Sequence, residues 1–290
     1  MTNTIDIVVL PVGGMGTRFL PATKAVPKEM LPILDRPLIQ YAVDEALEAG
    51  IQEIVLVTAR GKGAMDDYFD QAFELETTLA SRGKTRELES LKPTRLPPGQ
   101  VTSVRQQEPL GLGHAVWCAR AIVGQRPFAV ILPDDLVHGS PGCLRQMVDS
   151  WADVGGNLVA VEEVPRERTA SYGIVTPGET RGRLTEVRGL VEKPKPEEAP
   201  SNLAVIGRYI LQPEVMDLLA EGKRGAGGEI QLTDAMAGLL GRQPFHGFAF
   251  EGTRHDCGNV AGATIATLSL ALDRPDIAPS VRAWAAEHLQ

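Results

Sequence analysis

The chain has 290 residues, of which 43% are hydrophobic and 23% charged, values ordinary for a globular protein with one large α/β domain or two smaller ones. Its net charge of -8 argues against a nucleic-acid partner held by a general basic surface. The cysteines Cys118, Cys143 and Cys257 are too few and too scattered for a disulfide framework. We see no signal peptide and no apolar run long enough for a membrane, so we expect a cytoplasmic protein without a membrane partner.

The N-terminal segment has the pattern of a βαβ unit. Ile5–Val12 is a continuous run of apolar residues, many of them β-branched, which predicts a fully buried strand. A glycine loop follows, and a helix is predicted from Pro37 through Ala49, with Gly50 as its stop. Ile54–Val57 is a second buried strand. Crossovers of this kind imply a parallel sheet sheltered by helices.

The middle of the chain leaves the sheet and returns to it. Asp66–Leu91 is rich in Glu, Leu, Ala and Arg, and predicts one or two helices outside the main sheet. Val101–Val104 is the next strand, followed by a helix that ends near Ile122. Phe128–Leu132 is a further buried strand, and it ends at Pro133, Asp134 and Asp135.

Beyond a helix at Cys143–Trp151 the connections become shorter, which predicts mixed or antiparallel pairing. The strands expected there are Leu158–Val164, Gly173–Val175, Leu184–Glu192 and Ala204–Leu211. Glu229–Leu240 is predicted to be helical, and an Ala- and Leu-rich helical tail is predicted at Thr264–Leu272 and Val281–Leu289.

The glycine loop indicates a polyphosphate ligand. Glycines in Gly14–Arg18 directly follow the first strand, and without a Cβ they let the backbone approach a bulky anion. Prolines then fix an extended path that carries Arg18, Lys24 and Lys28. A cradle of backbone N–H groups with an arginine and lysines is suited to a polyphosphate. On the glycines alone, a tight turn without any ligand remains an alternative.

Two acidic positions predict a Mg²⁺ site. Asp134 and Asp135 end a buried strand at the carboxyl edge, where open α/β sheets bind ligands. Asp256 follows the strand-like run Phe245–Phe250, so two strand-end carboxylates could share one hard cation. An Asp turn or a helix cap is the alternative. His255 and Cys257 flank Asp256, but alternation would point them away from it, which disfavours zinc.

The segment Glu192-Lys193-Pro194 ends a strand and carries one charge of each sign. A proline favours an extended residue before it, so we expect Glu192 and Lys193 to point to opposite sides of the chain. One side chain could then bind sugar hydroxyls and the other a phosphate. An ordinary exposed charge pair is the alternative.

Together these segments resemble the sugar-1-phosphate nucleotidylyltransferases, most closely the bacterial UTP–glucose-1-phosphate uridylyltransferases. The resemblance extends to about residue 262 and is carried by the motifs Gly14–Pro32, Gln106–Ala115, Leu132–Asp135, Ser171–Gly173, Val191–Pro194, Gly227–Asp234 and Asp256–Gly258. The first two are highly specific. Gly13 replaces a usual alanine, His255 a usual aromatic residue and Val260 a common lysine.

The resemblance implies a Rossmann-like mixed, mostly parallel sheet with helices on both faces, followed by a C-terminal helical tail. Residues 1–262 would form the catalytic domain, and 263–290 the tail. It also implies a Mg²⁺-dependent reaction in which UTP and glucose 1-phosphate give UDP-glucose and pyrophosphate. We expect a homodimer or homotetramer, with the tail and the helices at 66–91 as the natural contact surfaces.

Site residues follow from the same resemblance, position by position. Arg18, Lys28 and Lys193 would be catalytic, and Asp134 and Asp256 would hold Mg²⁺. The nucleotide would bind at Gly13, Gly14, Gly16, Thr17, Gln106 and Gly111, with Gln106 and Gly111 facing the uracil. The glucose would contact Gly173, Glu192 and Val205.

Three other functions are alternatives to this interpretation. A thymidylyltransferase acting on the same sugar phosphate would differ only in a few contacts around Gln106. A sugar-nucleotide-binding protein without activity should lack an acid or Lys193, yet all are present. An NAD-linked dehydrogenase is disfavoured because Phe19 occupies the position of the third glycine of a dinucleotide-binding loop.

Overall fold

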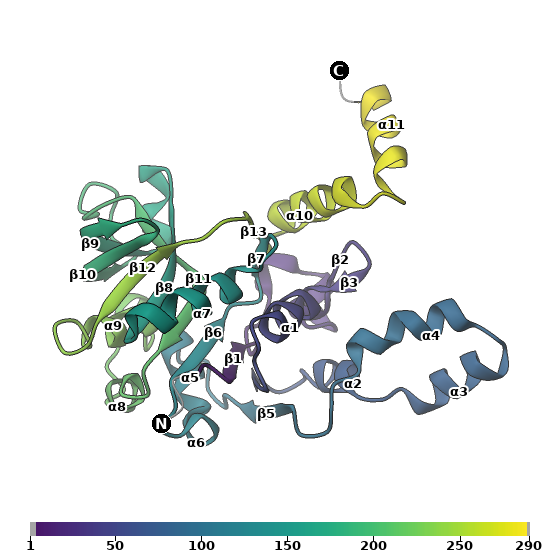
Figure 1. The fold of residues 1–290 in the computed structure, drawn as a ribbon, viewed down its shortest axis with the longest axis horizontal. Coiled ribbons are helices and arrows are strands. Elements are labelled where there is room, and N and C mark those ends of the chain that lie inside the picture. Colours follow the sequence, from purple (N-terminus) through teal and green to yellow (C-terminus); the bar gives the residue numbers. More distant parts are fainter. Residues whose placement is uncertain (1–3, 289–290) are drawn as a thin grey trace.

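A nine-stranded mixed sheet forms the centre of the computed structural model, which describes residues 4–288 (Figure 1). The strand order is β5-β4-β1-β6-β11-β8-β12-β10-β9. Their bounds are β1 (Ile7–Pro11), β4 (Glu53–Thr58), β5 (Val101–Arg105), β6 (Phe128–Ile131), β8 (Asn157–Glu163), β9 (Gly173–Arg181), β10 (Leu184–Glu192), β11 (Leu203–Leu211) and β12 (Phe245–Ala249). Two small two-stranded sheets are β2 (Pro32–Ile33) with β3 (Arg36–Pro37), and β7 (Asp135–His138) with β13 (Thr253–Asp256).

The direction of the strands changes halfway across the sheet. Strands β5, β4, β1 and β6 pair with one another in parallel, as the βαβ pattern predicted. Beyond β6 only β8 and β12 pair in parallel, and the other five pairings are antiparallel. The predicted mixed fold is confirmed, but "mostly parallel" describes only its N-terminal half.

Helices cover both faces of the sheet, as expected. Their bounds are α1 (Leu38–Glu48), α2 (Ala64–Phe69), α3 (Phe73–Ser81), α4 (Thr85–Leu91), α5 (Leu112–Cys118), α6 (Arg120–Val123), α7 (Cys143–Val154), α8 (Val215–Ala220), α9 (Leu232–Ala237), α10 (Val260–Asp273) and α11 (Ala278–His288). Val8 and Leu10 of β1 pack with α1 and α7, whereas Ile7 and Val9 pack with α5, α8 and α9. Because strand side chains alternate, a strand covered on both faces reads as a continuous apolar run.

Two helical predictions need correction. The segment predicted as one or two helices outside the sheet contains three, and the first of them, α2, belongs to the core because Met65 and Phe69 are buried. Only α3 and α4 lack buried residues, and they project from the body as a hairpin (Figure 1). The helix predicted at 229–240 forms only at α9, since Glu229 is extended.

The predicted helical tail is present as α10 and α11, which extend away from the sheet (Figure 1). Leu289, where the sequence placed the end of the second helix, lies outside the described residues. The tail carries exposed apolar side chains, including Ile265, Leu268 and Trp284. Within residues 4–288, no helix combines the length and the apolar character that crossing a bilayer requires.

Candidate active site

A cleft of about 350 Å³ opens where the strands around the centre of the sheet end. It gathers seven of the predicted site residues from segments far apart in the chain, namely Arg18, Asp134, Gly173, Glu192, Lys193, Val205 and Asp256. Parallel strands place their carboxyl ends at one edge, so residues that follow different strands meet there. The remaining predicted residues lie in the glycine loop and around Gln106, described below.

The two acids predicted to share a cation do converge. Asp256 is the last residue of β13, and it lies opposite Asp135 in the pairing with β7. The backbone N–H of Cys257 donates to the carbonyl oxygen of Asp134 at 2.7 Å. Backbone hydrogen bonds therefore fix the distance between the acids, and the strand that delivers Asp256 is β13 rather than the predicted run Phe245–Phe250.

Gly258 marks the space between the acids. A Cβ atom placed on this glycine would lie 3.0 Å from Asp256 Oδ1, and 3.2 Å from both Asp134 Oδ2 and Arg18 Nη2. Two carboxylate oxygens and a guanidinium thus surround one point that the missing side chain leaves open. Gly258 also donates its N–H to Asp256 Oδ1 at 3.0 Å.

Lys28 completes this charged cluster. Its Nζ donates to Asp134 Oδ2 at 2.6 Å, and both side chains are partly exposed. Burial alone would raise the pKa of Asp134, but the charges of Lys28 and Arg18 and the hydrogen bond from Lys28 outweigh it. The pKa of Asp134 is therefore below its ordinary value, and the carboxylate is ionised at neutral pH.

The glycine loop folds back over Lys28. Gly16 has a φ of +67°, in the left-handed region that favours glycine, and its carbonyl accepts a hydrogen bond from Thr23 Oγ1 at 2.7 Å. A Cβ on Gly14 would lie 3.7 Å from Lys28 Cε. Thr17 begins a short 3₁₀ turn with its side chain exposed. The predicted extended path is wrong, since the segment folds into three short 3₁₀ turns at Thr17–Phe19, Ala22–Lys24 and Lys28–Met30, and these turns bring Gly14 and Gly16 next to Lys28.

Gln106 directly follows β5 and lies beside Gly13, at the start of the glycine loop. Its Nε2 donates to the carbonyl oxygen of Gly111 at 3.0 Å and lies 3.1 Å from His114 Nδ1. Its Oε1 would be 3.4 Å from a Cβ on Gly13. Gly111 has a φ of +110° and packs against the backbone of Ile230, where a Cβ would clash. Gly13, Gln106 and Gly111 therefore form one group, as predicted.

The residues predicted to contact the glucose lie on and beside the β9–β10 pair. Glu192 lies directly opposite Gly173 in this pair, and a Cβ on Gly173 would lie 3.2 Å from Glu192 Oε2. The same point is 3.0 Å from Thr233 Oγ1. No role was predicted for Thr233 from the sequence, although this residue lies inside the motif Gly227–Asp234. Val205 of β11 lines the cleft beside them.

The expected orientation of Lys193 is wrong. Its φ is +48°, so it is not extended, and its Nζ lies 3.1 Å from Glu192 Oε1. The backbone N–H of Lys193 donates to the carbonyl oxygen of Tyr172 at 2.9 Å. This hydrogen bond holds the residue in a conformation that the general preference before proline disfavours. Glu192 and Lys193 therefore face the same side of the chain, and both line the cleft.

Arg254 is a further cleft residue that the sequence did not reveal. It forms an ion pair with Asp135 Oδ1 at 2.6 Å, and its Nη1 donates to the Tyr172 hydroxyl at 3.3 Å. The adjacent acids thus face different partners, because Asp134 contacts Lys28 whereas Asp135 contacts Arg254. No pattern in the segment around Arg254 signals this role.

A zinc centre next to Asp256 is not supported. Burial, with a contribution from the Asp256 carboxylate, raises the pKa of Cys257 to about 12, so its thiol is neutral. Cys257 packs into an apolar cluster with Leu136 and Leu270. Over residues 4–288, no group of three or more His, Cys, Asp or Glu side chains is placed to hold a metal. A cation at Asp134 and Asp256 would need further ligands from a substrate.

Comparison with known proteins agrees with this geometry. A family model described as "Nucleotidyl transferase" matches residues 7–270. The chain is 55% identical over 259 residues to a UTP–glucose-1-phosphate uridylyltransferase of Komagataeibacter xylinus, covering 89% of this chain and 91% of that protein. A second such protein, from Bacillus subtilis (strain 168), is 47% identical over 269 residues, with 93% and 92% covered.

Solved structures give the same result. A UDP-glucose pyrophosphorylase complexed with UDP-glucose has a TM-score of 0.84 at 41% identity, covering 93% of this chain and 100% of that one. A UTP-bound UGPase from Acinetobacter baumannii has a TM-score of 0.89 at 42% identity, covering 99% and 100%. The chain belongs to the nucleotidyl transferase family and is a nucleotidyltransferase. Within that family it groups with the UTP–glucose-1-phosphate uridylyltransferases.

Proposed function

We propose that this enzyme joins the uridylyl group of UTP to glucose 1-phosphate, giving UDP-glucose and pyrophosphate, with Mg²⁺ as its cofactor. The observation that carries the proposal is the arrangement of the cleft. Two carboxylates, Arg18 and Lys28 meet at one end, and Glu192 with Lys193 lies at the other. Relatives and structural neighbours with full-length similarity bear names that specify the same substrates.

The donor set around Gly258 fits Mg²⁺. This cation prefers oxygen ligands, and it is usually bound by one or two carboxylates together with substrate phosphates. Asp134 and Asp256 supply two such carboxylates around a point that no side chain fills. A bound Mg²⁺ would neutralise phosphate charge there and keep the α-phosphate of UTP in place.

The residues of the chain then account for the rest of the reaction. The phosphate oxygen of glucose 1-phosphate is ionised at neutral pH, so the attack on the α-phosphorus needs no general base. A bond forms between that oxygen and the α-phosphorus, and the bond to the β-phosphate oxygen breaks, so pyrophosphate leaves with the electron pair. Arg18 and Lys28 stabilise the charge on the triphosphate, and Lys193 orients the attacking phosphate.

Substrate recognition uses the two ends of the cleft. Backbone N–H groups of Gly13, Gly14, Gly16 and Thr17 hold the phosphates, and Gln106 with Gly111 faces the uracil. Glu192 and the backbone at Gly173 and Val205 contact the glucose hydroxyls. Thr233, which lies beside Gly173, belongs to the same group of contacts.

Pyrophosphate release with a panel of nucleotides and sugar phosphates tests this proposal. We expect turnover with UTP and glucose 1-phosphate to exceed turnover with dTTP, CTP or ATP. We also expect it to require a divalent cation and to be lost in Asp134→Ala and Asp256→Ala. Faster turnover with dTTP would make the protein a thymidylyltransferase, and full activity in EDTA would refute the role of Mg²⁺.

We also propose that the enzyme is a cytoplasmic homodimer or homotetramer. Its three cysteines are unpaired, which fits a reducing compartment. Ile265 and Leu268 expose about half of their surface on α10, which is unusual for large apolar side chains that have no partner. Light scattering of the unsubstituted protein and of Ile265→Glu, Leu268→Glu tests the assembly, and a monomer in both samples would refute it.

A further inference from the structure

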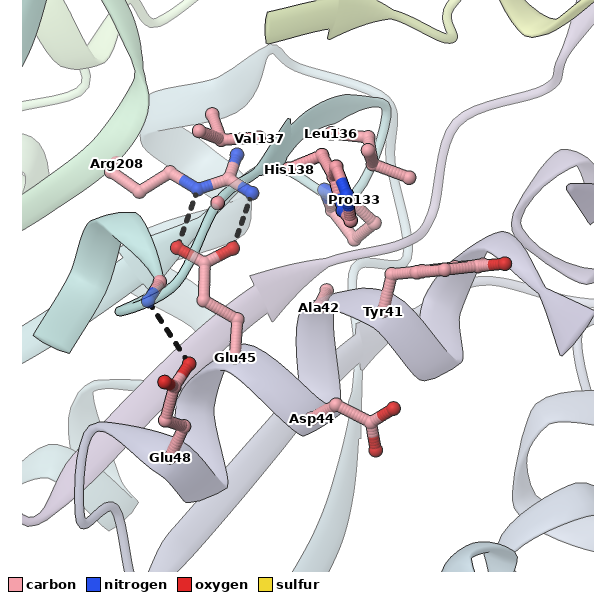
Figure 2. Close-up of a pocket in the computed structure, with 12 residues that line it drawn as sticks. Tyr41, Ala42, Asp44, Glu45, Glu48, Pro133, Leu136, Val137, His138 and Arg208 are labelled. Atoms are coloured by element: carbon pink, nitrogen blue, oxygen red, sulfur yellow. Dashed lines mark hydrogen bonds and ion pairs between the residues drawn. The ribbon is translucent and has the colours of Figure 1, made fainter. Parts of the chain in front are cut away.

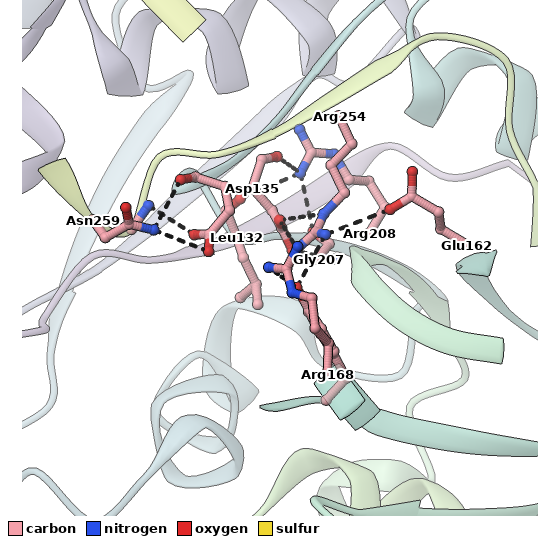
Figure 3. A network of polar contacts seen from close by, with 11 residues as sticks. Leu132, Asp135, Glu162, Arg168, Gly207, Arg208, Arg254 and Asn259 are labelled. Atoms are coloured by element: carbon pink, nitrogen blue, oxygen red, sulfur yellow. Dashed lines mark hydrogen bonds and ion pairs between the residues drawn. The ribbon is translucent and has the colours of Figure 1, made fainter. Parts of the chain in front are cut away.

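Asp134 lies in a short turn between β6 and β7. The backbone carbonyl groups on both sides of this turn accept hydrogen bonds from one buried arginine. Arg208 of β11 is almost completely buried, with 1% of its surface exposed. Its Nη1 donates to the carbonyl oxygens of Leu132, at 3.3 Å, and Asp135. These two residues flank the segment Pro133-Asp134, so both ends of the turn are attached to the same guanidinium (Figure 3).

The remaining donors of Arg208 are fixed by a carboxylate. Its Nε and Nη2 donate to the two oxygens of Glu45, on α1, at 3.1 and 2.7 Å (Figure 2). Glu45 Oε1 also accepts the backbone N–H of Leu144 at 2.9 Å, in the first turn of α7. Arg208 therefore connects the turn to α1 and α7, two helices whose buried side chains pack into the same core.

The residue next to Arg208 binds the same turn. Gly207 accepts a hydrogen bond from the N–H of Leu132 at 2.8 Å, and its own N–H donates to Asp135 Oδ2 at 3.0 Å. A Cβ on Gly207 would lie 2.7 Å from Leu132 Cβ, so the turn sits directly on β11. The backbone N–H of Cys257 also donates to the carbonyl oxygen of Asp134, so the backbone on both sides of Asp134 is hydrogen-bonded.

We propose that Arg208 is a positioning residue for catalysis, which sets where the Asp134 carboxylate meets a divalent cation. A buried ion pair contributes little to stability, because desolvation offsets the attraction, so its geometry is the more informative feature. A guanidinium can bind a carboxylate with one edge and carbonyl oxygens with another, which an ammonium cannot do. This inference rests on the proposed role of Asp134 as a Mg²⁺ ligand.

The test is the affinity for Mn²⁺ in Arg208→Lys, measured by electron paramagnetic resonance with UTP present and no sugar phosphate, so that no turnover occurs. Loss of the groups that orient a metal ligand usually weakens metal binding about 10- to 100-fold, and we expect that loss here. The melting temperature is recorded alongside. Arg126→Lys is the control, since Arg126 also binds both oxygens of one carboxylate, that of Glu53, but does so at the N-terminal ends of β4 and β6.

Each outcome decides the inference. A folded Arg208→Lys with Mn²⁺ affinity within twofold of the control would overturn it. If that variant does not fold, the Glu45→Met, Arg208→Met double variant replaces it, because it leaves no buried charge unpaired. Failure of both to fold would also overturn the inference, since Arg208 would then serve the fold alone. If the unsubstituted protein binds no Mn²⁺ with UTP, the proposed metal site fails, and this inference with it.

Discussion

Replacing Gly258 by alanine should inactivate the enzyme without removing any charge. The new methyl group would lie 3.0 Å from Asp256 Oδ1 and 3.2 Å from Asp134 Oδ2 and Arg18 Nη2, closer than ordinary van der Waals contact. Gly258 does not have a positive φ, so alanine strains no backbone angle. The carboxylates must move by a few tenths of an ångström or more, and the space proposed for the cation is filled.

The expected loss follows from this geometry. A misplacement of about 1 Å in an active site can cost about 10²-fold in rate, which corresponds to about 2.7 kcal/mol of transition-state free energy. The partly exposed side chains around Gly258 can shift, so we expect the free energy of unfolding to fall by only about 1 kcal/mol, or about 3 °C in melting temperature. Activity and stability should therefore separate clearly.

Pyrophosphate release at saturating substrates, with a Mg²⁺ titration and a thermal melt, measures both quantities. Gly63→Ala is the control, because Gly63 has a φ of -60° and a Cβ there would meet nothing within 4 Å. We expect this control to keep full activity and to be unchanged or slightly stabilised. If Gly258→Ala turns over within about twofold of the control, the space between the acids is not where the cation or the phosphates bind.

Three further predictions concern single groups. Lys193→Ala should lower kcat/KM for glucose 1-phosphate by about 10²- to 10³-fold in steady-state kinetics, and unchanged kinetics would refute its role. In folded protein at pH 8, iodoacetamide should label Cys118 but not Cys143 or Cys257, whose pKa values burial raises to about 12 each; mass spectrometry reports the sites. Because Lys28 lowers the pKa of Asp134, their pairing stabilises the fold above about pH 4 and is lost progressively at lower pH, so urea unfolding of Asp134→Asn should approach that of the unsubstituted protein as the pH falls below about 4.

The strands that carry the site could be predicted from the sequence because they are covered on both faces. A short run such as β1, which has apolar side chains at every position and is followed by glycines, is typical of a buried strand. The rule that ligands bind at the carboxyl ends of such strands then placed Asp134 correctly. This part of the prediction needed no information on long-range contacts, and the structure confirms that Asp134 lies in the cleft just after β6.

The second acid was predicted for a less direct reason. Asp256 belongs to β13, which is only four residues long and pairs with β7, more than a hundred residues earlier in the chain. Its sequence, with a threonine, an arginine and a histidine, has no strand pattern of its own. A pairing of this kind depends on tertiary contacts. Asp256 was predicted from its place after a strand, but from the wrong strand, Phe245–Phe250, and the motif resemblance indicated the same residue.

Lys193 and Arg254 show why side-chain placement was harder to predict. The preference for extended residues before proline was outweighed by one hydrogen bond, from Lys193 N–H to the Tyr172 carbonyl oxygen. Arg254 lines the cleft as the ion-pair partner of Asp135, which follows Asp134 in the chain. Both placements depend on partners that lie in other segments, which local sequence rules do not include.

The site therefore combines groups of two kinds. Backbone hydrogen bonds of β7, β13 and Cys257 hold the chain segments that carry Asp134 and Asp256 next to each other. Arg18 and Lys28 lie on a loop of short turns, and Arg18 is exposed. Carboxylates on paired segments suit the proposed Mg²⁺, which requires regular geometry, whereas the cations on the loop are suited to phosphates whose charge shifts as a bond to the α-phosphorus breaks. Substitutions that disturb the first group should therefore weaken metal binding, and those that disturb the second should chiefly lower the rate.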